Sequence, residues 1–408
     1  MSERVVTFED ALDEVLGHAR VSLGGRAVET VELLAGAGRV LGAAVVADRD
    51  QPPFDRSTRD GFAVRAGDVG NALRVVGSVR AGESWQGAAL AKGEAVEIMT
   101  GAPLPDGVDA VVMVEHVELE DGLLRVEAGR SLRVGENVVP RGAEARAGGV
   151  VLPAGRVLGA AEIAVAASCG LAEVKVFVRP KVAIVATGDE LVELDQPMDV
   201  WQIRNSNSYA LAALVRDEGG VGERLDIARD TLEELRDRVT EGRKADLLLL
   251  SGGVSMGKYD LVEQVLLEAG AEFFFTGALI QPGKPIVFGR LPKQSGWTYF
   301  FGLPGNPVST QVCFHLFVAP MLRALAGRTE ISPRFVEARL VEDVRGGARV
   351  TRFLPAELGG GWDGVSVRVV GWQGSGDVAA NARGNGYVVL PAGVAAFAAG
   401  ETVRVLLR

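Results

Sequence analysis

KVAIVATGDE, residues 181–190, joins a continuous apolar run to a polar turn that contains glycine. The apolar run is short and rich in β-branched residues, which is typical of a strand buried on both faces of a sheet. DLLLLSGG, residues 246–253, repeats this pattern of a buried strand followed by a glycine-containing turn. Because parallel strands end at the same edge of a sheet, the two turns are expected to lie close together.

Helix-compatible stretches separate further apolar runs on either side of these two strands. Strands are predicted at residues 273–275, 286–288 and 299–301, and helices at residues 206–218, 232–240, 261–269 and 308–325. Strands that alternate with helices predict an α/β domain with a doubly wound, mostly parallel sheet covered on both faces.

The flanking sequence has a different pattern. Residues 7–20 predict a short helix with Thr7 as its N-cap, and residues 158–169 are also compatible with a helix. Between residues 61 and 155, short β-like runs are broken by Gly, Pro and Asp, which predicts a small β-rich module. Residues 335–408 show similar runs with Gly-rich turns and predict a small C-terminal β-barrel.

Composition narrows the functional classes. The net charge of −10 over 408 residues argues against a general nucleic-acid binder, although local cations and backbone N–H groups can still hold an anion. Cys169 and Cys313 are far apart in apolar contexts and predict buried free thiols, and the three histidines show no zinc-type spacing. The N-terminus lacks an apolar signal core and no uncharged run reaches the length of a membrane span, so the cytoplasm is the expected location.

Ser251-Gly252-Gly253 follows one of the buried strands, and Ser255 lies just beyond it. Two successive glycines allow the backbone to approach a ligand, and the serine hydroxyls are hydrogen-bond donors. The loop therefore indicates either a site for phosphate or another oxyanion, or a strand-to-helix turn that needs glycine for steric reasons.

Three carboxylates are expected at the same sheet edge. Asp189 is interpreted as a turn or capping residue, whereas Glu190 and Asp260 are predicted to act at the site. Carboxylates beside an anion site usually hold a hard cation such as Mg²⁺, which bridges to substrate oxygens.

Two further loops are predicted to contribute to the site because their prolines restrict the backbone. Lys284 stands between two prolines, so a stiff loop presents it towards an anion, unless it is a solvated turn lysine. Pro304-Gly305-Asn306-Pro307 suits a shaped pocket wall, and Ser309 is predicted to cap the following helix rather than to bind an oxyanion.

Outside the central domain the polar positions are ambiguous. Asp60 before Gly61 is typical of a turn, and Thr100-Gly101 after a predicted strand has the same double interpretation. The chain contains no Gly-Lys-Ser/Thr phosphate loop and no Gly-x-Ser-x-Gly elbow, and its strand-end loops lack the dinucleotide fingerprint. A P-loop kinase, a serine hydrolase and a Rossmann dehydrogenase are therefore disfavoured.

Taken together and in this order, the loops resemble the molybdopterin molybdenumtransferase family, which includes MoeA and the gephyrin E domain. The matching stretches are PPFDRSTRDGFAV (52–64), IMTGAPLP (98–105), VGENVVPRGAE (134–144), VAIVATGDELVE (182–193), LLLLSGGVSMGKYD (247–260), QPGKPIVFG (281–289), FGLPGNPVST (301–310) and GSGDVAANARGNGYVVLP (374–391). The resemblance covers essentially the whole chain.

The resemblance implies an elongated homodimer whose subunits have four parts. These are residues 1–50 with 140–178 for linking and dimerisation, 51–139 as a β-rich insertion, 179–327 for molybdopterin binding, and 328–408 as the barrel. It also implies insertion of molybdate into adenylylated molybdopterin with release of AMP, assisted by Mg²⁺. Other proteins of molybdenum cofactor biosynthesis are possible partners, and neither nucleic acid nor a membrane is expected as one.

The resemblance also assigns roles to residues. Asp60, Glu190, Asp260 and Lys284 are the expected catalytic residues, with Glu190 and Asp260 as metal ligands. The expected substrate-binding residues are Thr100, Gly101, Thr187, Gly188, Ser251, Gly252, Gly253, Ser255, Pro304, Gly305, Asn306, Pro307 and Ser309. The loop that carries Asp60 is expected to complete the cleft of the partner subunit.

Two positions depart from the family pattern. Arg59 stands where many members have Met, which would add a cation to the cleft, and Gly142-Ala143-Glu144 replaces Gly-Glu-Asp, so the acidic role passes to Glu144 or is lost. Alternatives to the proposed activity are a molybdopterin adenylyltransferase, tungstate insertion by the same chemistry, and a non-enzymatic dimeric scaffold.

Overall fold

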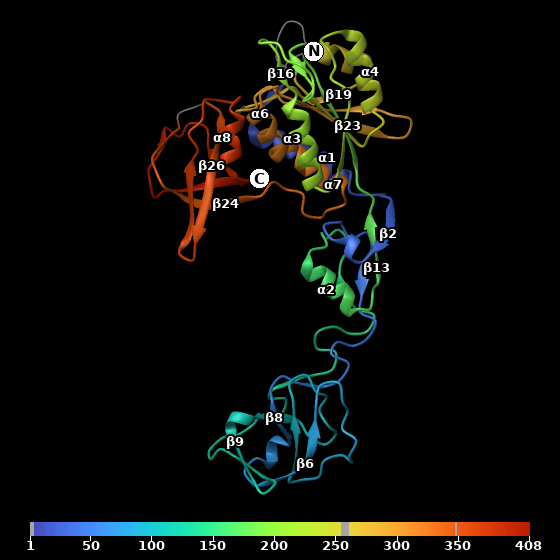
Figure 1. Ribbon diagram of the computed structural model, residues 1–408, viewed down its shortest axis with the longest axis vertical. Helices are drawn as coiled ribbons and strands as arrows, with labels where there is room; N and C mark the ends of the chain where they lie inside the picture. Colours follow the sequence, from blue (N-terminus) through green and yellow to red (C-terminus); the bar gives the residue numbers. More distant parts are fainter. Residues whose placement is uncertain (1–3, 254–260, 347–348) are drawn as a thin grey trace.

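The computed structural model describes residues 4–253, 261–346 and 349–408 of the chain. Figure 1 shows an elongated molecule. An α/β domain and a small barrel lie side by side at one end, a narrow part with β2, β13 and α2 follows, and a β-rich module with β6 and β8 forms the other end. The α/β class with flanking β-rich parts is thus confirmed, while the residue limits predicted for the four parts stay predictions.

The central sheet has six strands in the order β17-β14-β18-β23-β22-β19. The strands are β14 (Lys181–Ala186), β17 (Val221–Arg224), β18 (Leu247–Ser251), β19 (Glu272–Phe275), β22 (Val287–Pro292) and β23 (Trp297–Leu303). The first four in spatial order are parallel, but β22 runs antiparallel to both of its neighbours. The sheet is therefore mixed, and the expectation of parallel pairing is wrong at this edge. Residues 293–296 between β22 and β23 form a short turn, which is too short for a parallel crossover.

Helices cover both faces of this sheet because alternate side chains of each strand point in opposite directions. Leu247 and Leu249 pack towards one face, under α1 (Phe8–Val21), α3 (Ser206–Asp217), α6 (Pro307–Cys313) and α7 (Ala319–Leu325). Leu248 and Leu250 pack towards α4 (Leu232–Gly242) and α5 (Leu261–Glu268) on the other face. Each fully buried leucine contributes about 1.5–3 kcal/mol, so both layers hold the sheet edge in place.

The helix that starts at Pro307 continues through a π-helical turn, Phe314–Val318, to Leu325. By length and apolar composition it is the one helix of the described residues that could cross a membrane. However, 94% of it is buried inside the protein, where it packs against the sheet. Its length and composition are accounted for by its place in the core.

The N-terminus is fixed to this domain. The predicted helix over residues 7–20 is confirmed as α1, and the Thr7 hydroxyl accepts a hydrogen bond from the Asp10 N–H. Before it, β1 (Val5–Val6) pairs in parallel with β20 (Gly277–Ala278). After α1 the chain passes from the α/β domain into the narrow part through β2 (Val28–Glu32). It comes back through β13 (Glu173–Phe177), which pairs antiparallel with β2 beside α2 (Ala160–Ser168).

The distal module is a six-stranded sheet in the order β8-β5-β7-β6-β10-β9. Its strands are β5 (Gly61–Val64), β6 (Leu73–Val79), β7 (Glu94–Ile98), β8 (Ala110–Met113), β9 (Val117–Glu120) and β10 (Leu123–Val126). Two short pairs of antiparallel strands connect this module to the narrow part of the molecule. They are β3 (Val45–Val46) with β12 (Val150–Leu152) and β4 (Arg56–Ser57) with β11 (Val138–Val139). The polar loop between residues 55 and 60 thus lies at the near end of this module.

The predicted C-terminal barrel is confirmed. Five strands, β24 (Phe335–Leu340), β26 (Thr351–Gly361), β27 (Gly364–Val369), β28 (Gly386–Leu390) and β30 (Thr402–Leu407), form a closed ring through the β26–β28 pairing. A further strand, β21 (Ile280–Gln281), pairs with β26 and connects the barrel to the α/β domain. The short helix α8 (Val378–Arg383) lies beside this junction (Figure 1).

Candidate functional site

A cavity of about 650 Å³ opens at the carboxyl ends of β14, β18 and β23. Its walls include residues from all three strand-end loops, from the start of α3 and from the barrel side. The lining residues are Ala186, Thr187, Gly188, Glu190, Leu191, Ile203, Arg204, Asn205, Ser206, Asn207, Asp230, Ser251, Gly252, Gly253, Pro285, Pro304, Gly305, Asn306, Pro307, Gly376 and Val378. Ten residues that the sequence singled out for substrate binding or catalysis meet here (Thr187, Gly188, Glu190, Ser251, Gly252, Gly253, Pro304, Gly305, Asn306 and Pro307).

The glycines of the β18 loop are required by its close approach to the β14 loop. Gly252 and Gly253 have φ angles of +94° and +65°, which side chains of L-residues rarely adopt. A Cβ atom at Gly252 would lie 2.5 Å from the Thr187 carbonyl oxygen, and one at Gly253 would lie 2.6 Å from Thr187 Oγ1. The steric interpretation of these glycines is therefore correct, and it holds together with their place in the cavity wall.

Thr187 itself carries an unusual feature. Its side chain is only 2% exposed, and its hydroxyl has no hydrogen-bond partner among the residues that the structure describes. Buried polar atoms are nearly always hydrogen-bonded, so this hydroxyl, which lies against Gly253 at the end of the β18 loop, is an exception among the described residues.

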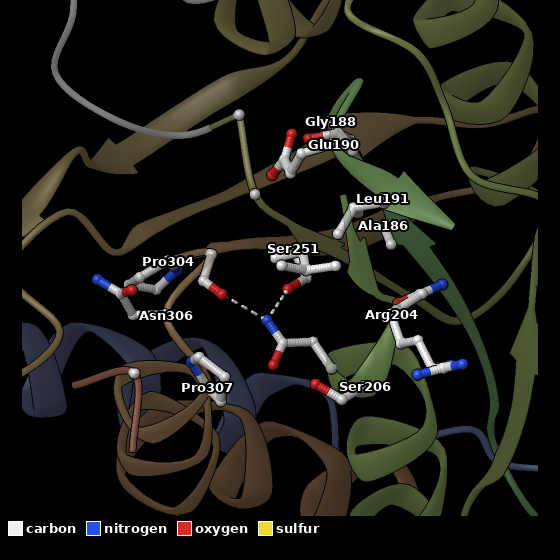
Figure 2. A pocket seen from close by; sticks show the side chains of 18 of the residues that line it. Ala186, Gly188, Glu190, Leu191, Arg204, Ser206, Ser251, Pro304, Asn306 and Pro307 are labelled. Atoms are coloured by element: carbon white, nitrogen blue, oxygen red, sulfur yellow. Dashed lines mark hydrogen bonds between the residues drawn. The ribbon is translucent and has the colours of Figure 1, made fainter. Parts of the chain in front are cut away.

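Asn207 connects the loops around the cavity. Its side-chain N–H groups donate hydrogen bonds to Ser251 Oγ (3.0 Å) and to the Gly305 carbonyl oxygen (2.7 Å), drawn as dashed lines in Figure 2. The sequence argument did not identify this residue. It could have been identified from its position in the first turn of α3, two residues after the N-cap Asn205, because a polar side chain there can face the sheet edge.

Replacing Asn207 with leucine is expected to destabilise the protein by about 1–3 kcal/mol, because two acceptors at the cavity wall lose their donor. Urea denaturation measures this loss. Ser206→Ala is the matched control, since Ser206 lines the same cavity from the same helix turn but bridges no loops among the described residues. Equal stability of the two variants would contradict the bridging role of Asn207.

Among the described residues, the carboxylates of Glu190 and Asp230 line the cavity. Gly188, with a φ of +143°, leaves room for the Glu190 side chain to fold back, since a Cβ atom there would lie 2.5 Å from Glu190 Oε2. Figure 2 shows Glu190 beside Gly188 above the Ser251 strand end. Burial, together with the charges of Asp189 and Glu190, raises the pKa of Asp230 above its ordinary value.

Asp230 was missed in the sequence because it directly precedes Thr231, the N-cap of α4, and so resembled part of a capping sequence. Its backbone N–H donates to Asp189 Oδ1 at 3.2 Å, which agrees with the interpretation of Asp189 as a structural residue.

No group of three metal-ligating side chains is present among the described residues. Asp260 and Ser255, for which the sequence predicted roles at this site, lie outside the described residues.

Lys284 and Ser309 do not line the cavity. Lys284 is exposed on the loop after β21, and only its neighbour Pro285 reaches the wall. Ser309 is buried in the first turn of α6. The prediction that Ser309 caps this helix is wrong, because the helix starts at Pro307 with Asn306 as its N-cap, and proline is favoured at the first helical position.

A second polar cluster lies in the distal module. The backbone N–H and the hydroxyl of Thr100 donate to Asp60 Oδ1 at 2.7 and 2.8 Å, and these hydrogen bonds lower the pKa of Asp60. Gly101 has a φ of +87°, and its N–H donates to the Ser57 carbonyl oxygen. The structure thus brings Asp60, Thr100 and Gly101 together, but in one chain their module lies at the opposite end from the sheet (Figure 1).

The two departures noted in the sequence lie near this cluster. Arg59 is exposed beside Asp60. Glu144 forms an ion pair with Arg56 at 2.8 Å, and the two side chains are 53% and 36% exposed. Among the described residues, Glu144 is therefore placed as a surface ion-pair partner.

Comparisons with known proteins cover nearly the whole chain. Residues 6–170 match the MoeA N-terminal region (domain I and II), residues 183–324 a probable molybdopterin binding domain, and residues 337–407 the MoeA C-terminal region (domain IV). A Nostoc sp. protein named molybdopterin molybdenumtransferase is 38% identical over 93% of this chain and 88% of its own length. A Staphylococcus aureus protein of the same name is 35% identical over 93% and 90%. A crystal structure of a molybdopterin biosynthesis moeA protein from Pyrococcus horikoshii OT3 has a TM-score of 0.80, 27% identity and coverage of 99% and 100%.

Proposed function

Since the chain belongs to the molybdopterin molybdenumtransferase family and so has a role in molybdenum cofactor biosynthesis, we propose that it inserts molybdate into adenylylated molybdopterin and releases AMP. The observation that carries this proposal is the cavity of about 650 Å³ at the strand ends. It combines carboxylates, the Ser251 hydroxyl and backbone turns that need glycine, which together suit a phosphorylated ligand and a cation.

The cavity walls supply positioning groups more than acid–base groups. Ser251 and Thr187 present hydroxyls, and Pro304 to Pro307 shape the opposite wall. In the proposed reaction, water adds to phosphorus, the phosphoanhydride bond breaks and AMP leaves. The two dithiolene sulfurs then bind molybdenum, and one oxygen of molybdate leaves as water with the two thiol protons, without a change of oxidation state. Such a reaction depends mainly on orientation and on electrostatic stabilisation of the oxyanions.

Glu190 and Asp230 suit a bound Mg²⁺. Mg²⁺ is usually held by one or two carboxylates together with substrate phosphates, so two carboxylates in one cavity wall meet this requirement. When bound, Mg²⁺ neutralises charge on the phosphates of the substrate. Asp260 is proposed as a further ligand, as the sequence indicated.

Asp60, Thr100 and Gly101 are proposed to complete the cavity of a second copy of the chain. Within one chain they belong to the distal module, which lies at the opposite end of the molecule from the α/β domain, and Asp60 is held in place by two hydrogen bonds. A homodimer in which the distal module of one subunit reaches the sheet edge of its partner would bring the two clusters together. We also propose that the enzyme acts in the cytoplasm.

Anaerobic incubation with molybdopterin-AMP tests the activity. We expect AMP to appear only when both Mg²⁺ and molybdate are present, as followed by chromatography. Replacing molybdate with tungstate in a parallel sample shows whether the enzyme selects the oxyanion. Absence of AMP release would overturn the proposal in favour of a scaffold. In a separate incubation with molybdopterin and ATP, formation of molybdopterin-AMP would favour an adenylyltransferase instead.

A further inference from the structure

Arg204 is the one lysine or arginine among the described residues that line the cavity. The other charged lining groups are the carboxylates of Glu190 and Asp230. Figure 2 shows Arg204 at the cavity edge next to Ser206, across from the Pro304 loop. Among the described residues, Arg204 is therefore the cation that a polyanionic ligand in this cavity would meet.

The side chain of Arg204 is exposed and makes no ion pair or hydrogen bond within the part of the chain that the structure describes. Two nearby arginines differ in this respect. Arg224 donates to Glu193 Oε2 at 3.3 Å and lies 3.6 Å over the ring of Tyr209, and Arg229 donates to the carbonyl oxygens of Asp189 and Leu191. These two stabilise the local fold, whereas the guanidinium of Arg204 keeps its donors available.

The backbone at Arg204 is nevertheless well fixed. Arg204 is on β16 (Ile203–Arg204), which pairs with β15 (Leu191–Val192). The N–H groups on either side of it donate to Glu190 and Val192 carbonyl oxygens, both at 2.9 Å. The backbone hydrogen bonds between β15 and β16 therefore place Arg204 and Glu190 at the same edge of the cavity.

We propose that Arg204 binds the phosphate groups of the adenylylated substrate, a role that rests on the proposed function. The planar guanidinium can donate two parallel hydrogen bonds to phosphate oxygens. Lys284, the cation that the sequence favoured for this role, does not line the cavity. Glu190 directly precedes β15 and Arg204 is on the paired strand β16, so phosphate oxygens between the two would face both a cation and a metal-binding carboxylate.

Equilibrium binding of AMP and of adenosine to the full-length protein tests this role, with R204Q, R204K and R216Q as variants. Arg216 is on α3, its side chain is 75% exposed, and its one ion pair among the described residues is with its neighbour Asp217 at 3.9 Å. It does not line the cavity, so R216Q makes the same charge change away from it. We expect R204Q to weaken AMP binding by about tenfold or more, as for one lost charge-assisted hydrogen bond. R204K should recover only part of the affinity, while R216Q and all adenosine affinities stay unchanged.

Unchanged AMP affinity in R204Q, or an equal loss of AMP and adenosine affinity, would overturn the role of Arg204 without touching the proposed function. A wild-type protein that binds neither AMP nor molybdopterin-AMP would instead overturn the proposed function, and the role of Arg204 with it. Thermal unfolding of each variant verifies that it is folded.

Discussion

Replacing Glu190 with glutamine is expected to slow AMP release by about a hundredfold or more, as for the loss of one preorganised electrostatic group in an active site. Glutamine keeps the shape of the side chain that folds back over Gly188 but removes its charge. With one fewer carboxylate in the cavity wall, the Mg²⁺ concentration needed for half-maximal rate should also rise. Single-turnover assays over a range of Mg²⁺ concentrations measure both effects.

Asp189→Asn is the matched control for this variant. Asp189 precedes Glu190, but its side-chain oxygen accepts the Asp230 N–H, and an asparagine oxygen can still accept that hydrogen bond. We expect the control to keep most of the wild-type rate and Mg²⁺ dependence. If Glu190→Gln and Asp189→Asn behaved alike, Glu190 would have no special part in the reaction.

Replacing Glu218 with alanine is expected to lower the free energy of unfolding by about 3–5 kcal/mol, because it leaves Arg323 charged and buried without its partner. Glu218 follows α3, and its carboxylate accepts from Arg323 Nε at 2.8 Å and from Arg328 at 3.2 Å. The Glu218 and Arg323 side chains are only 11% and 7% exposed. The pair thus anchors the far end of the helix whose first turn lines the cavity.

The same contact gives a pH dependence. Burial alone would raise the pKa of Glu218, but the hydrogen bonds and charges of Arg323, together with the charge of Arg328, lower it overall. A carboxyl group with a lowered pKa in the folded state stabilises the protein above its ordinary value of 4.5, and that stability is lost as the pH falls further. Urea denaturation between pH 7 and the acid range should therefore show a steeper loss in wild type than in Glu218→Ala.

Glu268→Ala serves as the control for stability. It removes an ion pair with Arg236 of similar length, 2.8 Å, but both side chains are well exposed, so solvent screens the interaction. We expect only a small change in unfolding at any pH. A similar loss of stability in both variants would show that burial does not determine the contribution of the Glu218 pair.

The sequence predicted the strand-end loops of the site better than the side chains between them. The runs that end at Ala186, Ser251 and Leu303 could be recognised as buried strands, and their turns meet at one cavity. The antiparallel direction of β22 could not be recognised from the sequence. The strand extends to Pro292, and the short hairpin turn that follows it shows no hydrophobic periodicity that would distinguish it from a longer connection. The helix starting at Pro307 was placed too late because its cap is Asn306 rather than a serine.

The cavity residues that the sequence did not identify all lie in segments whose local pattern has an ordinary structural interpretation. Asp230 resembled part of a helix cap, Asn207 a polar residue in a first helical turn, and Arg204 an ordinary surface arginine. Their place in the cavity depends on the β15–β16 pairing and on crossovers that bring distant segments together. The separation of Asp60, in the distal module, from the cavity of the same chain likewise depends on long-range geometry, which local spacing does not encode.

A crystal structure of the protein with molybdopterin-AMP, grown without molybdate, is the most direct measurement. We expect the compound in the cavity, with its phosphates between Arg204 and Glu190 and its rings between the Ser251 and Pro304 loops. The compound bound at another surface, with this cavity empty, would contradict the claim that the turns at the sheet edge form the substrate site.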